Sequence, residues 1–231
     1  YYLQNKLVSL SGEFNGAELE YGVRTLGGMG APGQSDVPLV KAEEGGPIGD
    51  LYTHTFVEYD ADGNLILQDT NEDGTVDPAD RVVTGNGMPD AEFGWANNFR
   101  YKSFDANITF RSVLGHDLIN TYRGFYEVPR MIGSYNLPAT AMDQRNENGT
   151  LYNASSGVLN SSHVENASFL SIDNVTIGYN FDMSGSSAFR SIRVYLAGNN
   201  LLYITGYKGT DPNVRYADGD NTLIPGIEES R

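Results

Sequence analysis

The sequence has no cysteine, few basic residues and no long apolar run. Without cysteine there are no disulfides, no thiolate nucleophile and no cysteine-based zinc site, which excludes a small secreted disulfide scaffold. Fifteen Lys and Arg against 30 Asp and Glu give a net charge of −15, which argues against nucleic acid as a partner. No basic cluster exists for electrostatic docking on anionic lipid, although acidity does not argue against insertion into a membrane.

Hydropathy predicts no transmembrane helix, because no run of about 18 apolar residues is present. It does not exclude membrane β-strands, since each of these needs only about 10 residues of alternating character. The chain opens on Tyr1-Tyr2-Leu3 and stops at Ser230-Arg231 without a recognisable terminal element. We therefore expect it to be a segment of a longer protein.

Alternation of apolar and polar residues is the dominant pattern, and it predicts β-strands rather than helices. Three segments show it, and each is about as long as a tilted membrane strand requires and longer than the five or six residues of an average soluble strand. Their apolar positions are Phe104, Ala106, Ile108, Phe110 and Leu114 in the first, Val175, Ile177, Tyr179 and Phe181 in the second, and Ile192, Val194, Leu196 and Gly198 in the third.

Long polar segments separate these strands. Residues 27–49 are rich in Gly and Pro and are expected to form an irregular connection, and residues 129–168 are rich in Asn and Ser with little periodicity. Such long connections are unusual in a compact soluble domain, whereas long extracellular loops alternating with short turns are normal in outer-membrane barrels. Residues 182–188 are expected to form one of the short turns, and residues 60–64 a hairpin turn.

Residues 69–80 have the spacing of an EF-hand-type calcium loop. Oxygen-bearing side chains stand at loop positions 1, 3, 5, 9 and 12 and Gly74 at position 6, with Asp in place of the usual bidentate Glu at the end. Because no helices are expected beside it, we expect a structural clip between strands rather than a calcium-triggered switch. The expected Ca²⁺ ligands are the side chains of Asp69, Asn71, Asp73, Asp80 and, through water, Asp77, together with the carbonyl of Thr75.

A carboxylate-rich turn that solvates itself is the alternative to a calcium loop. Without a cation, four Asp side chains on one small loop repel each other, which favours the metal site.

No arrangement of catalytic residues is recognisable, so we expect no enzyme. The three histidines, His54, His116 and His163, lack metal-ligand spacing, and no G-x-S-x-G nucleophile elbow is present. Aromatic side chains of the long connections either pack the loops together, which is favoured, or stack on sugar rings or contact a lid protein. They are Tyr122, Phe125, Tyr126, Tyr135 and Tyr152.

Four ordered stretches of the chain form a recognisable set. They are Asp69–Asp80 followed by Arg81, Gly85-Asn86, Pro89 and Phe93-Gly94; Ala167–Phe181; Ser191–Asn213, which contains Gly198-Asn199-Asn200 and Asp211-Pro212-Asn213; and Pro225-Gly226-Ile227-Glu228. In this order they resemble motifs of SusC/RagA-type proteins, the TonB-linked outer-membrane importers of Bacteroidetes. Four motifs in sequence are far more specific than any one alone, and they cover most of the chain.

The resemblance implies an all-β fold, a transmembrane antiparallel β-barrel of the TonB-dependent transporter type with roughly 22 strands. Residues 1–231 would supply a C-terminal portion with long extracellular loops, and the plug domain and last strand would lie outside the chain. The polar face of the first alternating strand would line the lumen and its apolar face would meet lipid. The polar residues are Asp105, Asn107, Thr109 and Arg111.

The same resemblance implies TonB-dependent uptake of oligosaccharides or peptides across the bacterial outer membrane, without covalent chemistry. The implied partners are a SusD-like surface lipoprotein, the TonB complex (through the absent N-terminal part), outer-membrane lipid and the cargo, and a homodimer of importer pairs is compatible with it. The alternative from another class is a secreted, calcium-stabilised β-sandwich that binds carbohydrate. A sandwich should have shorter strands with turns about every 8–12 residues, and the long strands count against it.

Overall fold

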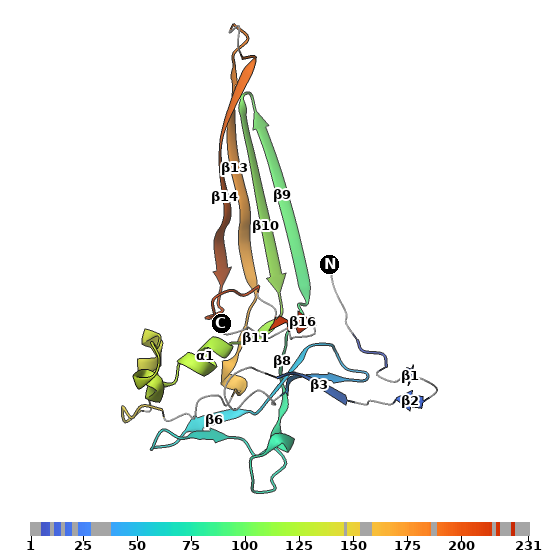
Figure 1. Ribbon diagram of the computed structural model, residues 1–231, viewed down its shortest axis with the longest axis vertical. Helices are drawn as coiled ribbons and strands as arrows, with labels where there is room; N and C mark the ends of the chain where they lie inside the picture. Colours follow the sequence, from blue (N-terminus) through green and yellow to red (C-terminus); the bar gives the residue numbers. More distant parts are fainter. Residues whose placement is uncertain are drawn as a thin grey trace.

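The structure, a computed structural model, describes residues 6–9, 12–14, 17–19, 23–28, 38–145, 147–152, 159–185, 189–213, 216–217 and 223–224. Tyr1, Tyr2 and the Pro225–Glu228 motif lie outside the described residues. A long sheet rises from a wider part made of shorter strands, a short helix and 3-10 turns (Figure 1). Within the described ranges, no helix is both long and apolar enough to cross a membrane.

Four antiparallel strands form the upright sheet in the order β14-β13-β10-β9. β9 spans Ala91–Tyr101, β10 Phe104–Leu114, β13 Phe169–Asp182 and β14 Ser191–Thr205. The first of the three predicted strands coincides with β10. The apolar positions of the second and third predicted strands lie within β13 and β14. The β9–β10 turn and the β13–β14 connection lie at the same end of the sheet, and the longer connections form the wider part at the other end (Figure 1).

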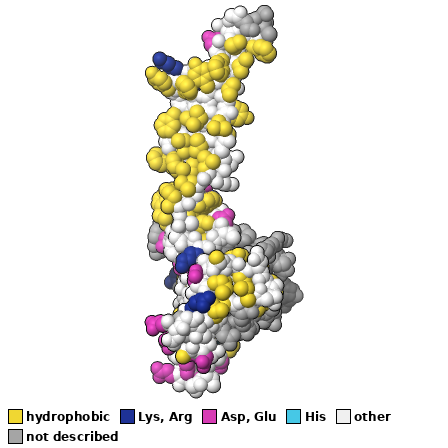
Figure 2. Space-filling model, turned by 90° about the vertical axis from the view of Figure 1, so that its left-hand side faces the viewer, with side chains coloured by type: hydrophobic (Ala, Val, Ile, Leu, Met, Phe, Trp, Pro, Cys, Tyr) yellow, Lys and Arg dark blue, Asp and Glu magenta, His cyan; other side chains and the backbone are white. Residues whose placement is uncertain are grey.

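The strand register gathers the apolar positions of all four strands on one face. Ala106 lies opposite Phe99 of β9 and Ile177 of β13, and Ile177 lies opposite Leu196 of β14. Figure 2 shows hydrophobic side chains along the upright sheet, with most of the visible charged ones on the wider part. The opposite face of β10 carries the polar set expected from the sequence, namely Asp105, Asn107, Thr109 and Arg111.

A β-bulge in β13 keeps the two faces separate along the whole strand. Ile172 and Asn174 have partners in both neighbouring strands, whereas the register steps over Asp173. Without this extra residue, the side chains before and after it would change faces. The Asp173 carboxylate accepts hydrogen bonds from Arg111 Nε at 2.9 Å and from Ser171 Oγ at 2.6 Å. The bulge residue therefore stays on the polar side as half of an ion pair.

The largest buried core lies in the wider part, beside the end of the long sheet. β3 (Val23–Gly28), β4 (Pro38–Glu43), β5 (Asp50–Thr53) and β8 (Val82–Asn86) form a second antiparallel sheet. β11 (Asp117–Ile119) pairs with β12 (Val164–Asn166). Full burial of an aliphatic side chain contributes about 1.5–3 kcal/mol to stability. The core of buried aliphatic side chains in this part therefore holds the connections in place. Its buried members are Leu39, Val40, Leu51, Ile119 and Leu159, with Phe125 and Val164 packed against them.

The remaining elements are short. They are β1 (Gly12–Phe14), β2 (Ala17–Leu19), β6 (Phe56–Tyr59), β7 (Leu65–Leu67), β15 (Tyr216–Ala217), β16 (Leu223–Ile224), α1 (Thr121–Tyr126), η1 (Pro78–Asp80), η2 (Pro129–Gly133), η3 (Ala139–Asp143) and η4 (Ser161–His163).

The connection after β14 folds back onto the base of the sheet. Tyr207 is buried against Leu118 and Ala167. Arg111 Nη1 donates to Asn213 Oδ1 at 2.9 Å, and His116 Nε2 lies 3.1 Å from the carbonyl oxygen of Pro212. This segment therefore ties the last long strand to β10 and β11.

β4 and α1 differ from the sequence-based expectation, and so does β12, which lies inside the Asn- and Ser-rich connection. β4 lies inside the stretch expected to be irregular, and α1 begins just before the long Asn- and Ser-rich connection. The side chain of Asn120 starts α1 by accepting the backbone N–H of Arg123 at 3.0 Å. β4 and α1 are held by packing in the core rather than by a strong local pattern. The hairpin turn at residues 60–64 is confirmed between β6 and β7, with Gly63 at a φ of 81°.

Gly124 and Gly133 provide a test of core packing with the same substitution at two sites. A Cβ at Gly124 would lie 2.4 Å from Leu159 Cδ2, whereas a Cβ at Gly133 meets nothing within 4 Å. We expect Gly124→Ala to lower the free energy of unfolding by about 1–3 kcal/mol, because the core has no room for the methyl group. Gly133→Ala should have little effect or stabilise slightly. Denaturant unfolding of the full-length protein in detergent measures both, and equal effects would contradict this packing.

Candidate functional site

The loop at residues 69–80 connects β7 to β8 and contains the turn expected of a calcium loop. Gly74 at position 6 has a φ of 90°, a left-handed conformation that favours glycine. Its backbone N–H donates to Asp69 Oδ2 at 2.8 Å, which brings the first and sixth positions together. The spacing read from the sequence therefore corresponds to a closed loop.

Asp80 organises this loop from its last position. Its carboxylate is buried and accepts the backbone N–H groups of Thr70 (2.7 Å) and Asn71 (3.2 Å) on Oδ1 and of Asp77 (2.8 Å) on Oδ2. These hydrogen bonds hold the pKa of Asp80 below its ordinary value, and the bond from the N–H of Asp77 has the largest effect. Asp77 in turn accepts the N–H of Ala79 at 2.7 Å and begins η1.

Short-range hydrogen bonds connect the side chains in the middle of the loop, around Asp73. Asp73 Oδ1 accepts the hydroxyl of Thr75 at 2.7 Å and its N–H at 2.9 Å, and Asp73 Oδ2 accepts Asn71 Nδ2 at 3.0 Å. The Thr75 hydroxyl is the main reason why the pKa of Asp73 lies below its usual range. The carboxylates of Asp73 and Asp80 are thus both held ionised at neutral pH, as carboxylate ligands of a cation must be.

The donor set fits a hard cation, and one oxygen lacks a protein partner. Asp69 Oδ1 is buried and, among the described residues, has no hydrogen-bond partner. A buried carboxylate oxygen without a donor is costly unless a cation or water satisfies it. However, the described residues contain no group of three or more His, Asp or Glu side chains positioned to hold a metal ion. Calcium binding by Asp69, Asn71, Asp73, Thr75, Asp77 and Asp80 therefore stays a prediction.

The polar face of the long sheet is a second candidate functional surface. Asn107 Nδ2 donates to Asn98 Oδ1 at 2.6 Å, and Asn174 Nδ2 donates to Asn199 Oδ1 at 2.7 Å. These amide pairs lie between two ion pairs, Arg111 with Asp173 and Arg193 with Asp105. The face is therefore hydrophilic but its charges are largely compensated.

Aromatic side chains of the loops pack against one another, as favoured from the sequence. Tyr126 contacts Tyr122, Phe125 and Tyr135, with ring centroids 4.8–6.3 Å apart. Tyr152 stacks on Tyr59 at 3.7 Å, a partner from the β6–β7 hairpin that sequence reasoning missed. The pair forms because residues 147–152 fold back onto this hairpin, and no local sequence pattern indicates that contact.

The histidines are dispersed rather than gathered in one site. Burial, together with the neighbouring Arg123 charge, lowers the pKa of His163 to about 4. Its Nδ1 accepts the backbone N–H of Asn160 at 3.3 Å at the start of η4. Burial also lowers the pKa of His54. His163 and His54 therefore lie in packed surroundings, and neither belongs to a common site.

Similar proteins are found among curated sequences. The chain is 27% identical over 176 residues to TonB-dependent receptor P3 of Formosa agariphila, covering 69% of this chain and 16% of that protein. It is 26% identical over 163 residues to TonB-dependent receptor SusC of Bacteroides thetaiotaomicron, covering 68% and 16%. The chain thus spans about a sixth of the length of these relatives. No protein-family model matches it.

Solved structures of the RagAB peptide transporter share the fold. One matches with a TM-score of 0.67 and 20% identity over 83% of this chain and 22% of that chain. Another, the importer in a closed-closed state, matches with a TM-score of 0.65 over 92% and 24%. The resemblance to SusC/RagA-type proteins is confirmed, and the all-β fold is that of part of a TonB-dependent transporter barrel. The relatives are named as receptors and transporters, in agreement with the expectation that the chain is not an enzyme.

Asp80→Asn and Asp77→Asn provide a matched test of the loop's internal bonds. In Asp80→Asn an amide NH₂ would face the N–H of Asp77, so we expect faster hydrogen exchange across residues 66–81. Asn caps a helix start about as well as Asp, so Asp77→Asn should leave exchange nearly unchanged. Mass spectrometry of the full-length protein measures both, and similar exchange in the two variants would contradict the role of Asp80.

The same loop should lose protection in acid. Because the pKa values of Asp73 and Asp80 are lowered on folding, their contribution to stability is present above the unfolded-state pKa of about 4. It is lost as the pH falls through their lower folded-state values. Protection of residues 66–81, corrected for the intrinsic pH dependence of exchange, should therefore hold from about pH 7 to 5 and fall below about pH 4.

Proposed function

We propose that the full-length protein is an outer-membrane, TonB-dependent importer of oligosaccharides or peptides, and that this chain forms part of its barrel wall and extracellular loops. A SusD-like lipoprotein would cover the extracellular mouth, and the TonB complex would supply energy through a part of the protein outside this chain. Two such importers side by side are compatible with this assignment. The names of the curated relatives and of the RagAB peptide transporter support it.

The observation that carries the proposal is the two-faced sheet of strands 11–15 residues long. On its apolar face Leu196 is 77% exposed and Trp95 66% exposed. An apolar surface of this extent is a liability in water and is suited to lipid. The other face carries amides and compensated charges, as the lining of an aqueous lumen does. The sheet thus has the amphipathic character of a membrane barrel wall.

The arrangement of connections supports an orientation. The short turns at one end of the sheet would face the periplasm, and the wider part would face outward, as in bacterial outer-membrane barrels. The calcium loop, the aromatic cluster and the folded-back segment after β14 would then all lie on the extracellular side. In this position they can contact cargo and a lipoprotein lid.

Fractionation of cells producing the full-length protein tests the location. We expect it in the outer-membrane fraction, released only by detergent. Recovery in a soluble fraction without detergent would defeat the proposal.

The two faces of β14 provide a sharper form of this test. Leu196→Arg places a charge on the apolar face near the middle of the strand, where it should cost about 2–4 kcal/mol in a bilayer. Ala197→Arg places the same charge on the next residue, on the polar face. We expect the first variant alone to lower the folded fraction in lipid vesicles. If both variants fold equally well, the assignment of the faces is wrong.

We also propose that the loop at residues 69–80 binds Ca²⁺ as a structural clip on the extracellular side. Calcium at about 100 times its Kd should stabilise the loop against unfolding by about 2.7 kcal/mol. Asp69→Ala with Asp73→Ala should therefore lower the melting temperature more in calcium than in excess chelator, where only the hydrogen bonds of the two side chains are lost. Asp62→Ala in the neighbouring turn should have little effect in either. An identical loss in chelator would count against metal binding.

A further inference from the structure

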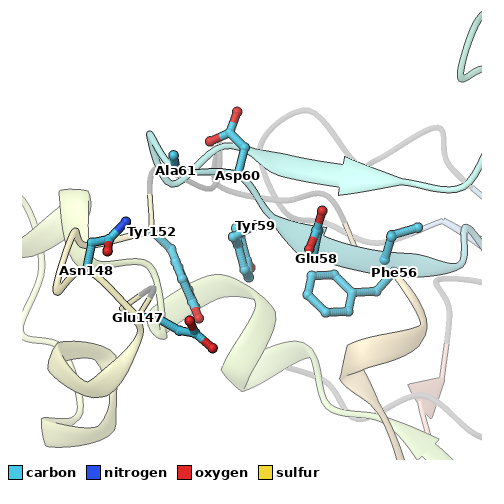
Figure 3. A pocket seen from close by; sticks show the side chains of 9 residues that line it. Phe56, Glu58, Tyr59, Asp60, Ala61, Glu147, Asn148 and Tyr152 are labelled. Atoms are coloured by element: carbon cyan, nitrogen blue, oxygen red, sulfur yellow. The ribbon is translucent and has the colours of Figure 1, made fainter.

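A pocket of about 520 Å³ lies between the β6–β7 hairpin and residues 147–152 (Figure 3). Its lining includes no residue of the polar face of the long sheet or of the loop at residues 69–80. Its walls come from two segments almost 90 residues apart in sequence, and Glu147, Asn148 and Tyr152 face Phe56–Ala61 across it. Its volume lies in the range of pockets that bind small ligands, so it has room for a long amino-acid side chain together with neighbouring parts of a peptide.

Aromatic rings form the floor of this pocket. Tyr59 and Tyr152 are stacked at 3.7 Å with an angle of 11° between the rings, and Phe56 lies 5.3 Å from Tyr59. Burial, with Tyr152 as the second cause, raises the pKa of Tyr59. The three rings hold each other in place, so a ligand pays little to order them. A rigid aromatic wall also attracts a cation through the π-face or the phenol oxygen.

The charges at the pocket have one sign. Glu58, Asp60 and Glu147 line it, and the nine described lining residues include no Lys, Arg or His. Asp60 is occupied within its own turn, where it accepts the backbone N–H of Asn64 at 2.7 Å. By contrast, Glu58 and Glu147 are exposed and have no hydrogen-bond or ion-pair partner among the described residues. Their carboxylates are free to receive a ligand.

Two arginines near these segments are already engaged: Arg145, two residues before Glu147, and Arg123, whose charge acts on Tyr59. Arg145 donates to the carbonyl oxygens of Met142 (2.8 Å) and Gly149 (3.3 Å) within its own loop. Arg123 is paired with Glu127 at 2.8 Å and with Glu165. Neither arginine compensates the carboxylates of the pocket, so the pocket is complementary to a cation.

We propose that this pocket binds a cationic side chain of a peptide cargo, an Arg or Lys, and that Glu58 and Glu147 select it over neutral residues. This inference rests on the proposed import function and names a feature of its substrate. A neutral sugar ring is a poorer fit, because it brings no positive charge to the carboxylates of Glu58 and Glu147. An Arg side chain can place its flat guanidinium beside the rings and donate to a carboxylate at the edge of the pocket.

The probe is a pair of short peptides that differ only in charge. Acetyl-Ala-Arg-Ala-amide and its citrulline counterpart have the same shape at the tested position and no charged termini. Calorimetric titration of the full-length protein in detergent should show tighter binding of the Arg peptide. Glu58→Gln with Glu147→Gln should weaken its binding about 5- to 10-fold, the range expected of two partly exposed charge pairs. The citrulline peptide should bind equally to both proteins.

Asp62→Asn is the matched control. Asp62 lies in the same hairpin turn, is exposed and does not line the pocket, so its neutralisation should leave the affinity unchanged. Equal affinity for the two peptides, or equal losses in Asp62→Asn and the double variant, would overturn the proposal. The variants replace exposed side chains, and an unchanged melting temperature verifies that they fold. If the protein resides in the outer membrane but fails this titration, only the proposal for the pocket is refuted. If the protein is recovered in a soluble fraction, the proposed import function is refuted.

Discussion

The register of the four long strands is the constraint on which the rest of the structure depends. Because side chains alternate with a period of two, a slip of one residue in any strand would move its apolar residues to the polar face. The bulge at Asp173 shows how strictly this is held: Leu170 and Ile172 precede it and Val175 and Ile177 follow it, and only an extra residue brings both pairs to one face. The ion pair with Arg111 then satisfies the charge that the bulge introduces.

The strands and the hairpin were predictable from the sequence because their signals are local. Alternation over residues 104–114 marks β10, and Asp60 with Gly63 marks the turn between β6 and β7. The phase change at Asp173 is also visible in the printed sequence, where apolar residues change from even to odd positions, but it was not interpreted as a bulge. α1 and β4 could not be predicted in the same way, because both depend on a core assembled from distant segments.

The loop at residues 69–80 illustrates the limit of motif spacing. Spacing alone predicted the turn at Gly74, and the structure contains it, together with a closure of the loop onto Asp69. It did not predict that Asp80, read as the last calcium ligand, would have both oxygens bonded to backbone N–H groups. A carboxylate at a loop end can serve as ligand or as organiser, and the choice depends on where the backbone places its donors. Pocket residues such as Tyr152 had even less local signal, because their partners lie in another hairpin.

Charge is distributed differently over the sheet and the loops, and this distribution bears on how such a protein meets its cargo. On the polar face of the sheet, Arg111 with Asp173 and Arg193 with Asp105 are paired, so the lumen side contributes little net field. The excess of 30 acidic over 15 basic residues must then arise largely elsewhere, and Figure 2 shows acidic side chains on the wider part. Unpaired carboxylates at an entrance attract cations over a Debye length of about 8–10 Å and more strongly at low salt. In the proposed importer, a compensated wall behind an acidic entrance would allow cationic cargo to be collected at the mouth without being held within the lumen.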